Sequence, residues 1–336
     1  MPAFAPLAGA FVMAAFASAL LTACWIRFAN ARQIHDLPSQ RRLHMTATPR
    51  GGGIGIALVM VSTCLLLARV DTSTHWLRMA AAIASFSAIG LYDDLRPLSA
   101  PLKLLLQLCA AAQLLNALGL TTALPLLLVA IIAAAYVVNV WNFMDGSNGL
   151  VATQALLIAL AISAWPNTPM PLRLAALASA GASLGFLPFN FPIARVFLGD
   201  VGSHALGTSV FVLLWLAWRA GTVQYWQVLL FCTAMLLDAS LTLFLRAWRQ
   251  RKFWRAHREH LYQFAIRSGH SHVQVCLVYA AWTTIAIVVA RLGNAWRSPM
   301  PTSMLLLAAG LIGSVAYLRM KQQWLDQRNR RRQQAT

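Results

Sequence analysis

Long apolar runs follow one another along almost the whole sequence of 336 residues, and they restrict the folds that this chain can adopt. Hydrophobic residues make up 59% of the chain and charged residues only 11%, whereas ordinary soluble domains carry about 25% charged residues. A soluble core cannot bury this much apolar sequence, but an apolar run of about 20 residues can cross a bilayer as a helix. The sequence therefore predicts an all-α fold, a polytopic transmembrane helical bundle.

The apolar runs predict about eleven membrane spans. The connections between them are too short to hold a soluble domain. We therefore expect one integral membrane domain over residues 1–320 and a basic cytoplasmic tail over residues 321–336. The predicted spans cover residues 5–26, 52–68, 76–91, 102–119, 123–141, 150–165, 172–189, 204–219, 226–245, 273–290 and 302–318.

The distribution of basic residues predicts the orientation of the bundle. The first apolar run has no basic residue before it, and Arg27 and Arg32 follow it, which indicates an uncleaved helix that starts outside the cytoplasm. With this start, most of the 27 Lys and Arg residues fall in cytoplasmic connections and the C-terminus is cytoplasmic. This topology and attraction to anionic lipid account for the net charge of +18, so we expect membrane lipids as partners and no nucleic acid.

Acidic residues are scarce and gather at the predicted cytoplasmic ends of the spans. The chain has nine of them, and a charge inside the membrane costs about 2.5–3.5 kcal/mol, so acids near the bilayer point to a function. Asp93 and Asp94 follow an apolar run. This pair could hold a metal ion or take up a proton, and the alternative is that Asp94 caps the segment that follows it.

A second polar cluster lies at the end of the fifth predicted span, in the sequence NVWNFMDGSNG. Asn139, Asn142 and Asp145 are three residues apart and therefore share one helical face. They could hydrogen-bond a sugar, a base or a metal ion bound to phosphate. A simple glycine cap of the helix would need Gly146 but neither asparagine, so we favour a functional role.

Further clusters combine glycines with charged side chains. Asp200, next to Gly199, could offer oxygen to a hard cation such as Mg²⁺, or could be an ordinary N-cap. Arg42, His44 and Arg50 precede three glycines that could bind an anion, although the charges could also serve only to set topology.

Two histidines stand close together in the connection before the tenth predicted span. His257, Arg258 and His260 could contact a diphosphate, since their spacing is not that of the zinc motif HExxH. Asp238 lies inside the ninth predicted span and could pair within the bundle.

Five of these stretches together resemble, in order and spacing, the motifs of the polyprenyl-phosphate N-acetylhexosamine-1-phosphate transferases of glycosyltransferase family 4. This family includes the phospho-N-acetylmuramoyl-pentapeptide transferase of peptidoglycan synthesis. The matching stretches are residues 36–53, YDDL at 92–95, NVWNFMDGSNGL at 139–150, residues 185–207 and HREHLYQ at 257–263. The resemblance implies a multi-pass enzyme of the bacterial inner membrane whose active site faces the cytoplasm.

The resemblance also implies a reaction. A UDP-N-acetylhexosamine would give its sugar-1-phosphate to undecaprenyl phosphate and release UMP, which starts a lipid-linked glycan. Mg²⁺ would be the cofactor, with Mn²⁺ as an alternative ion, and a homodimer is one arrangement that such an enzyme could take.

The resemblance assigns roles position by position. Asp93 and Asp94 would engage the lipid phosphate, and one of them would accept its proton. Asp200 would be the main Mg²⁺ ligand. The other implied contacts are Asn142, Asp145 and Asn148 to the nucleotide or the metal shell, Phe197 stacked on uracil, and His257, Arg258 and His260 to the diphosphate or the sugar.

Departures from the family pattern favour one branch of it. HREH replaces the consecutive histidines of the peptidoglycan enzyme and is similar to the form in transferases that start O-antigen or related surface glycans. Asn148 replaces an aspartate that is common in the family, which weakens a metal role there. The alternatives are the pentapeptide transferase and, from a different class, a transporter or a binder of lipid carriers. Transporters tend to place ionisable groups at the membrane midplane, and only Asp238 suits that pattern.

Overall fold

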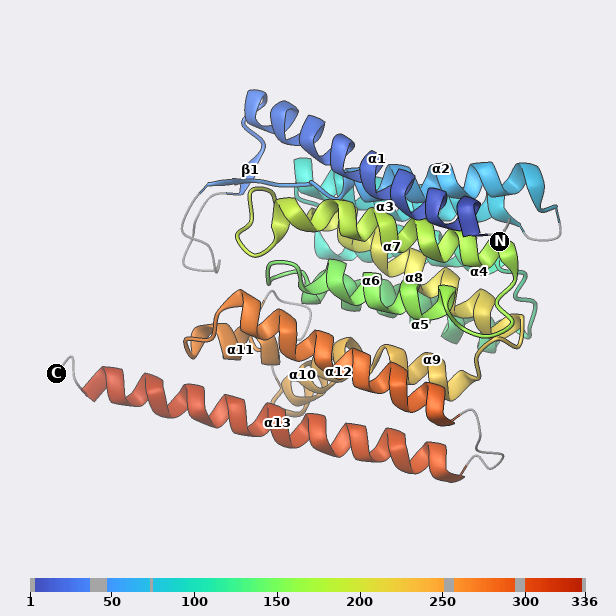
Figure 1. The fold of residues 1–336 in the computed structure, drawn as a ribbon. Helices are drawn as coiled ribbons and strands as arrows, with labels where there is room; N and C mark the ends of the chain where they lie inside the picture. Colours follow the sequence, from blue (N-terminus) through green and yellow to red (C-terminus); the bar gives the residue numbers. More distant parts are fainter. Residues whose placement is uncertain (1–3, 37–46, 73–74, 251–256, 294–299, 334–336) are drawn as a thin grey trace. The chain divides into compact units, whose positions relative to one another are not determined.

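The computed structural model describes residues 4–36, 47–72, 75–250, 257–293 and 300–333. Within these ranges the regular secondary structure is helical apart from one antiparallel pair of two-residue strands, which confirms the predicted all-α class (Figure 1). The chain forms two compact units, Met1–Gln224 and Tyr225–Thr336. Each unit is described separately below, and the single domain expected over residues 1–320 stays a prediction.

The first unit is a bundle built around α8. Prolines in the first turns of α4, α5 and α7 start these helices, because proline lacks the N–H that the first turn leaves unpaired anyway. The central helix α8 packs against α2, α3, α5, α6 and α7. The elements are α1 (Phe4–Ala31), β1 (His35–Asp36), β2 (Thr48–Pro49), α2 (Ile54–Val70), α3 (Trp76–Leu95), α4 (Ala100–Ala117), α5 (Leu124–Met144), α6 (Leu150–Ser163), α7 (Met170–Asn190) and α8 (Gly199–Arg219).

The second unit consists of α9 (Tyr225–Phe231), α10 (Thr233–Trp248), α11 (Leu261–Arg267), α12 (His272–Leu292) and α13 (Met300–Gln333). The ninth predicted span, a single helix over residues 226–245, is wrong in one respect: α9 and α10 are bent by 76° at a break between them. At the break, the Thr233 hydroxyl donates to the Leu230 carbonyl over 2.9 Å and accepts from the Trp282 indole. A side chain that competes for a main-chain carbonyl in this way favours an end to the helix.

Six of the described helices are long and apolar enough to cross a membrane, and a seventh crossing is added if the bent pair is counted as one. The other predicted spans also fall on helices, but the count of about eleven and the orientation of the termini stay predictions. Several candidate spans expose large apolar side chains, such as Phe16 on α1 and Ile132 on α5. This pattern suits helices that face lipid, and the protein is a multi-pass membrane protein.

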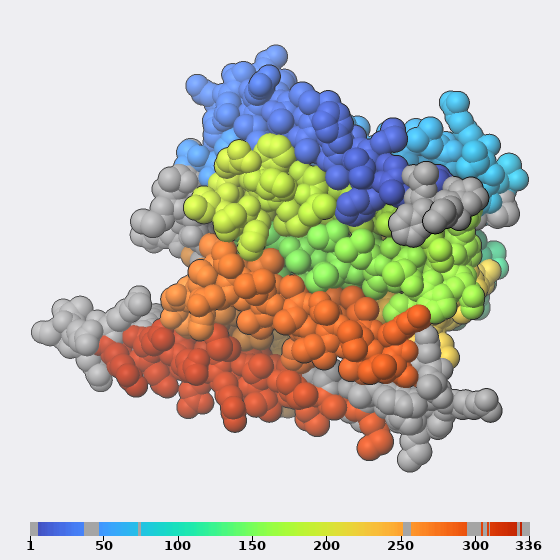
Figure 2. Space-filling model, in the orientation of Figure 1, coloured from blue at the N-terminus to red at the C-terminus, as the bar shows by residue number. Residues whose placement is uncertain are grey.

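Glycines allow the helices of the first unit to approach closely. In Figure 2 the atoms of α1, in blue, lie directly against those of α7, in yellow-green, where a Cβ at Gly181 or Gly185 would overlap the main chain of α1. Close to the start of α8, a Cβ at Gly53 would overlap the backbone of Gly202, and one at Gly90 would overlap the carbonyl of Asp200. These contacts hold α2 and α3 against the first turn of α8.

We expect Gly53→Ala to destabilise the first unit, because the added methyl group would meet backbone that cannot move aside. Overpacking of this kind costs about 1–3 kcal/mol. The matched control is Gly9→Ala on α1, where a Cβ would have no neighbour within 4 Å. Thermal unfolding of both variants in detergent checks the prediction, and equal midpoints for the two would contradict it.

Candidate active site

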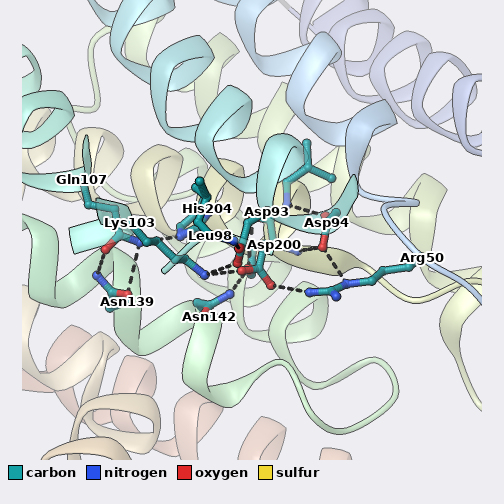
Figure 3. Close-up of polar contacts among 12 residues, drawn as sticks. Arg50, Asp93, Asp94, Leu98, Lys103, Gln107, Asn139, Asn142, Asp200 and His204 are labelled. Atoms are coloured by element: carbon teal, nitrogen blue, oxygen red, sulfur yellow. Dashed lines mark hydrogen bonds and ion pairs between the residues drawn. The ribbon is translucent and has the colours of Figure 1, made fainter. Parts of the chain in front are cut away.

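Polar side chains from four helices of the first unit meet with Arg50 at one place (Figure 3). Asp93 and Asp94 lie in the last turn of α3, Lys103 in the first turn of α4 and Asp200 in the first turn of α8. Asn142, near the end of α5, completes this group by donating from its amide to the Ser203 hydroxyl over 3.1 Å. Because every one of these residues is close to a helix end, the cluster forms where helix termini of opposite direction come together.

Two cations connect the carboxylates of the cluster. The Lys103 ammonium contacts a carboxylate oxygen of Asp93 at 2.9 Å and also pairs with Asp200. Arg50 reaches Asp200 from the other side, with 3.1 Å between its Nη2 and Oδ1 of Asp200. The two carboxylate oxygens of Asp200 are therefore engaged by different cations, and this carboxylate lies at the centre of the cluster.

The two adjacent aspartates have different surroundings. The Asp94 side chain is 1% exposed and accepts hydrogen bonds from the N–H groups of Asp200 and Val201, at 2.9 and 3.0 Å, while Arg50 Nε lies 2.6 Å from its Oδ1. Asp94 therefore caps α8, which is distant in sequence. The expected alternative, that Asp94 caps the segment following it, is wrong, because Asp93 is the residue that accepts the Leu98 N–H, over 2.6 Å. Asp93 remains 15% exposed.

Carboxyl groups outnumber cations among the described side chains of this cluster. Four carboxylates, those of Asp93, Asp94, Asp145 and Asp200, face the two cations Arg50 and Lys103. Burial, with the charge of Asp200, raises the pKa of Asp94 to about 7. Burial and the charges of Asp200 and Asp94 raise the pKa of Asp145 well above its usual range, although the Gly199 N–H donates to that carboxylate. An additional cation would relieve this repulsion.

The predicted helical face of α5 is only partly directed at the cluster. Asn142 and Asp145 reach it, but Asn139 exchanges hydrogen bonds with Gln107 of α4 over 2.9 and 3.2 Å. The Gln107 amide nitrogen also lies 2.9 Å from Nε2 of the buried His204. Asn139 therefore belongs to a buried polar network one turn away from the carboxylates.

Sequence reasoning missed Lys103, Gln107 and His204. Lys103 is the strongest omission, since it joins two of the predicted catalytic aspartates. The signal was available, because a lone lysine within an apolar span is as costly as a lone acid. Gln107 and His204 gave no such signal, since neutral polar side chains are common in helix interiors of a bundle.

The other predicted contacts lie at several places. Phe197 is half-buried just before α8, and its N–H donates to the Pro49 carbonyl over 2.8 Å. The Asn148 amide donates to the Pro192 carbonyl over 3.1 Å. Arg42 and His44 lie outside the described residues. His257, Arg258 and His260 belong to the second unit, in the loop before α11.

Comparison with known proteins shows that the helices of this cluster, although not Arg50, lie within a segment that matches a family model. Residues 76–219, which carry all of its helices, match the model of glycosyl transferase family 4. The decaprenyl-phosphate N-acetylglucosaminephosphotransferase of Mycobacterium tuberculosis is 28% identical over 327 residues, covering 84% of this chain and 80% of that protein. The probable undecaprenyl-phosphate N-acetylglucosaminyl 1-phosphate transferase of Bacillus subtilis is 24% identical over 333 residues, covering 92% of each chain.

A second kind of relative matches over a shorter range. The phospho-N-acetylmuramoyl-pentapeptide-transferase of Clostridioides difficile is 31% identical over 218 residues, which cover 55% of this chain and 65% of that protein. The relatives that act on N-acetylglucosamine are therefore similar along more of the chain.

Without added metal ions, we expect Asp94 to contribute a fall in thermal stability as the pH rises from 5 to 7.5. The folded state holds a proton on Asp94 up to a pKa of about 7, whereas the unfolded chain releases it near its ordinary pKa of about 3.9. The folded state thus holds more protons on this carboxyl in this range, so the contribution of Asp94 to stability declines with pH.

Unfolding midpoints measured in EDTA across this pH range check the expectation. Asp94→Asn should flatten the slope, and the matched control Asp71→Asn, in the connection between α2 and α3, should keep the wild-type slope. Equal slopes for the wild type and Asp94→Asn would show the assignment to be wrong.

Proposed function

The chain belongs to glycosyl transferase family 4, and we propose that it transfers a sugar-1-phosphate from a UDP-N-acetylhexosamine to undecaprenyl phosphate and releases UMP. The observation that carries this proposal is the cluster of Asp93, Lys103 and Asp200 at helix ends, inside the segment that matches the family, together with Arg50, which precedes that segment. The relatives named above are sugar-phosphate transferases that act on polyprenyl phosphates, and they align over most of this chain.

The proposed chemistry is a displacement at phosphorus. An oxygen of the lipid phosphate attacks the phosphorus that bears the sugar, the bond from that phosphorus to the oxygen of UMP breaks, and UMP leaves with the electron pair. Such reactions depend mainly on positioning and on neutralising the charge of the phosphates. Arg50 and Lys103 supply the positive charge, and both are held in place by carboxylates on two sides.

Asp93 is our candidate for the base that takes the proton of the lipid phosphate. Its carboxylate is 15% exposed and lies beside Lys103, so a phosphate can approach it. Asp94 is 1% exposed, and its oxygens are engaged by the start of α8 and by Arg50. We assign Asp94 to holding Asp200 and Arg50 in position.

Mg²⁺ is the cofactor that we propose, with Mn²⁺ as an alternative ion. The donor set fits it, because Asp200 and Asp145 bring oxygen ligands to a place where carboxylates outnumber cations. Mg²⁺ in proteins is usually held by one or two carboxylates together with water and substrate phosphates. When bound, the ion would neutralise charge on the diphosphate. No three His, Cys, Asp or Glu side chains of the described residues form a metal-binding group by themselves.

We further propose the bacterial inner membrane as the location, with the site facing the cytoplasm, and the start of O-antigen or a related envelope glycan as the pathway. The basic residues of the polar connections and the HREH sequence support these assignments. The pentapeptide transferase fits less well, since similarity to the relative of that kind covers 55% of the chain.

The reaction can be tested on the purified full chain in detergent. Undecaprenyl phosphate, Mg²⁺ and a panel of UDP-N-acetylhexosamines are supplied, and UMP is measured. We expect UMP release that requires the lipid and stops in EDTA, and the sugar with the highest rate would identify the donor. Folded protein that releases no UMP with any donor of the panel would refute the proposal.

Asp93→Asn should lower kcat by about 10²–10⁴-fold, the range typical for the loss of a general base. The folded protein should persist, because the substitution leaves the α8 cap in place. Asp71→Asn is the matched control, since it removes a carboxylate outside the cluster, and it should keep the wild-type rate. A kcat for Asp93→Asn within a few-fold of wild type would exclude Asp93 as the base.

A further inference from the structure

The loop His257–His260 in the second unit is held by a row of side chains on α10. Asp238, Thr242 and Arg246 are four residues apart, so they lie along one face of that helix. All three contact the loop or the start of α11, which follows the loop directly. This row is polar although α10 belongs to an apolar bent pair that could cross a membrane.

Asp238 fixes the start of α11. Its side chain is 1% exposed and accepts hydrogen bonds from the N–H groups of Leu261 and Tyr262, at 2.7 and 3.2 Å. It also accepts from the Tyr279 hydroxyl of α12 over 2.6 Å. The Thr242 hydroxyl also donates to it over 3.2 Å, so donors from α10, α11 and α12 converge on one buried carboxylate.

Thr242 and Arg246 fix Glu259 within the loop. The Glu259 carbonyl accepts from the Thr242 hydroxyl over 3.4 Å and from the Tyr317 hydroxyl of α13 over 3.0 Å. The Glu259 carboxylate lies 2.6 Å from Nη1 of Arg246. Both the main chain and the side chain of Glu259 are therefore anchored, and this acid faces the protein.

The neighbouring residues of the loop carry polar atoms without a partner. Within the described part of the chain, Nδ1 of His257 and Nη2 of Arg258 are buried and form no hydrogen bond. An unsatisfied buried polar group costs about 1–3 kcal/mol. The His257 ring stacks on that of His260 with 4.9 Å between centroids, so its orientation is fixed. Two nitrogen atoms without a protein partner, on adjacent residues, are suited to an anion with several oxygens.

Stability alone does not explain why the anchor is a buried carboxylate. Asp238 borders a pocket whose other walls include Leu241, Val278 and Trp282. Apolar side chains of similar volume often stabilise such a site as well as buried charges do, or better. A polar anchor that determines a unique loop geometry is a better explanation when the loop has to bind something.

We propose that Asp238, Thr242 and Arg246 are positioning residues that hold His257 and Arg258 in the orientation that binds the diphosphate of a nucleotide. Glu259 is the anchor of the loop. This inference rests on the proposed function and adds to it the residues that determine the affinity for the donor. It predicts that damage to the α10 row weakens nucleotide binding while leaving the affinity for the lipid unchanged.

The test measures binding of UDP to the purified full chain in Mg²⁺ by titration calorimetry, together with KM for the donor and for undecaprenyl phosphate. For Asp238→Asn and Arg246→Glu we expect UDP binding about tenfold weaker, a loss of about 1.4 kcal/mol. KM for the donor should rise by a similar factor, while KM for the lipid stays at the wild-type value. A purely structural role would lower the active fraction, and thus kcat, and would leave both KM values unchanged.

A charge exchange keeps the test decisive if Asp238→Asn fails to fold. Arg246→Glu and Glu259→Arg should each weaken UDP binding, and the double variant R246E/E259R should restore it. Thr233→Val is the matched control, because it removes a buried hydrogen bond on α10 at a distance of more than one turn from Asp238. It should keep the wild-type affinity for UDP.

The outcomes separate the two proposals. Unchanged UDP affinity and donor KM in folded Asp238→Asn, Arg246→Glu and Glu259→Arg would overturn the inference. Wild-type protein that binds UDP but releases no UMP with any donor would overturn the proposed function. In that case the comparison of UDP affinities would still decide the role of the α10 row.

Discussion

The capping of α8 by Asp94 is the interaction on which the first unit depends. The first turn of a helix leaves main-chain N–H groups without partners inside the helix. Here Asp94, at the end of α3, accepts two of them, and the close approach at Gly90 makes this contact possible. The same carboxylate holds Arg50. One residue thereby determines the positions of α3, α8, Arg50 and Asp200, and the substrate-facing groups are placed by an interaction that is itself hidden from solvent.

This arrangement concentrates negative charge at a cost. Burial disfavours ionised carboxylates and their mutual repulsion adds to this, so both effects raise the pKa values of Asp94 and Asp145. Burial lowers the pKa of Arg50, but the charges of Asp94 and Asp200 outweigh this effect and the net shift is upward. The cluster is therefore prepared to receive positive charge, and a phosphate substrate that arrived with a divalent ion would meet favourable surroundings. The crowded carboxylates therefore favour binding of such a ligand and, for the same reason, lower the stability of the protein without it.

Much of this site could be predicted from the sequence, because costly residues in an apolar context are conspicuous. The aspartates of α3 and α8 were predicted and meet, as do Asn142 and Asp145. What could not be predicted was which carboxylate is open and which is engaged, since that depends on a contact between Asp94 and a helix more than a hundred residues away. The break between α9 and α10 was not predicted for a similar reason: it contains no proline or glycine, and the bond from the Thr233 hydroxyl to the Leu230 carbonyl gives no signal in the sequence.

The two units use the same physical device. In each, a carboxylate near one helix accepts the N–H groups at the start of another, Asp94 for α8 and Asp238 for α11. Both side chains are 1% exposed, whereas Asp93 and Asp200 are 15% and 14% exposed. An acidic residue in an apolar sequence can thus act on a substrate or hold helices in position. The sequence does not distinguish these two roles, but the exposure and the partners of the side chain do. Asp94 and Asp238 are closed to solvent and hold the starts of other helices in place. Asp93 and Asp200 stay partly exposed and pair with side-chain cations, which they can exchange for a substrate.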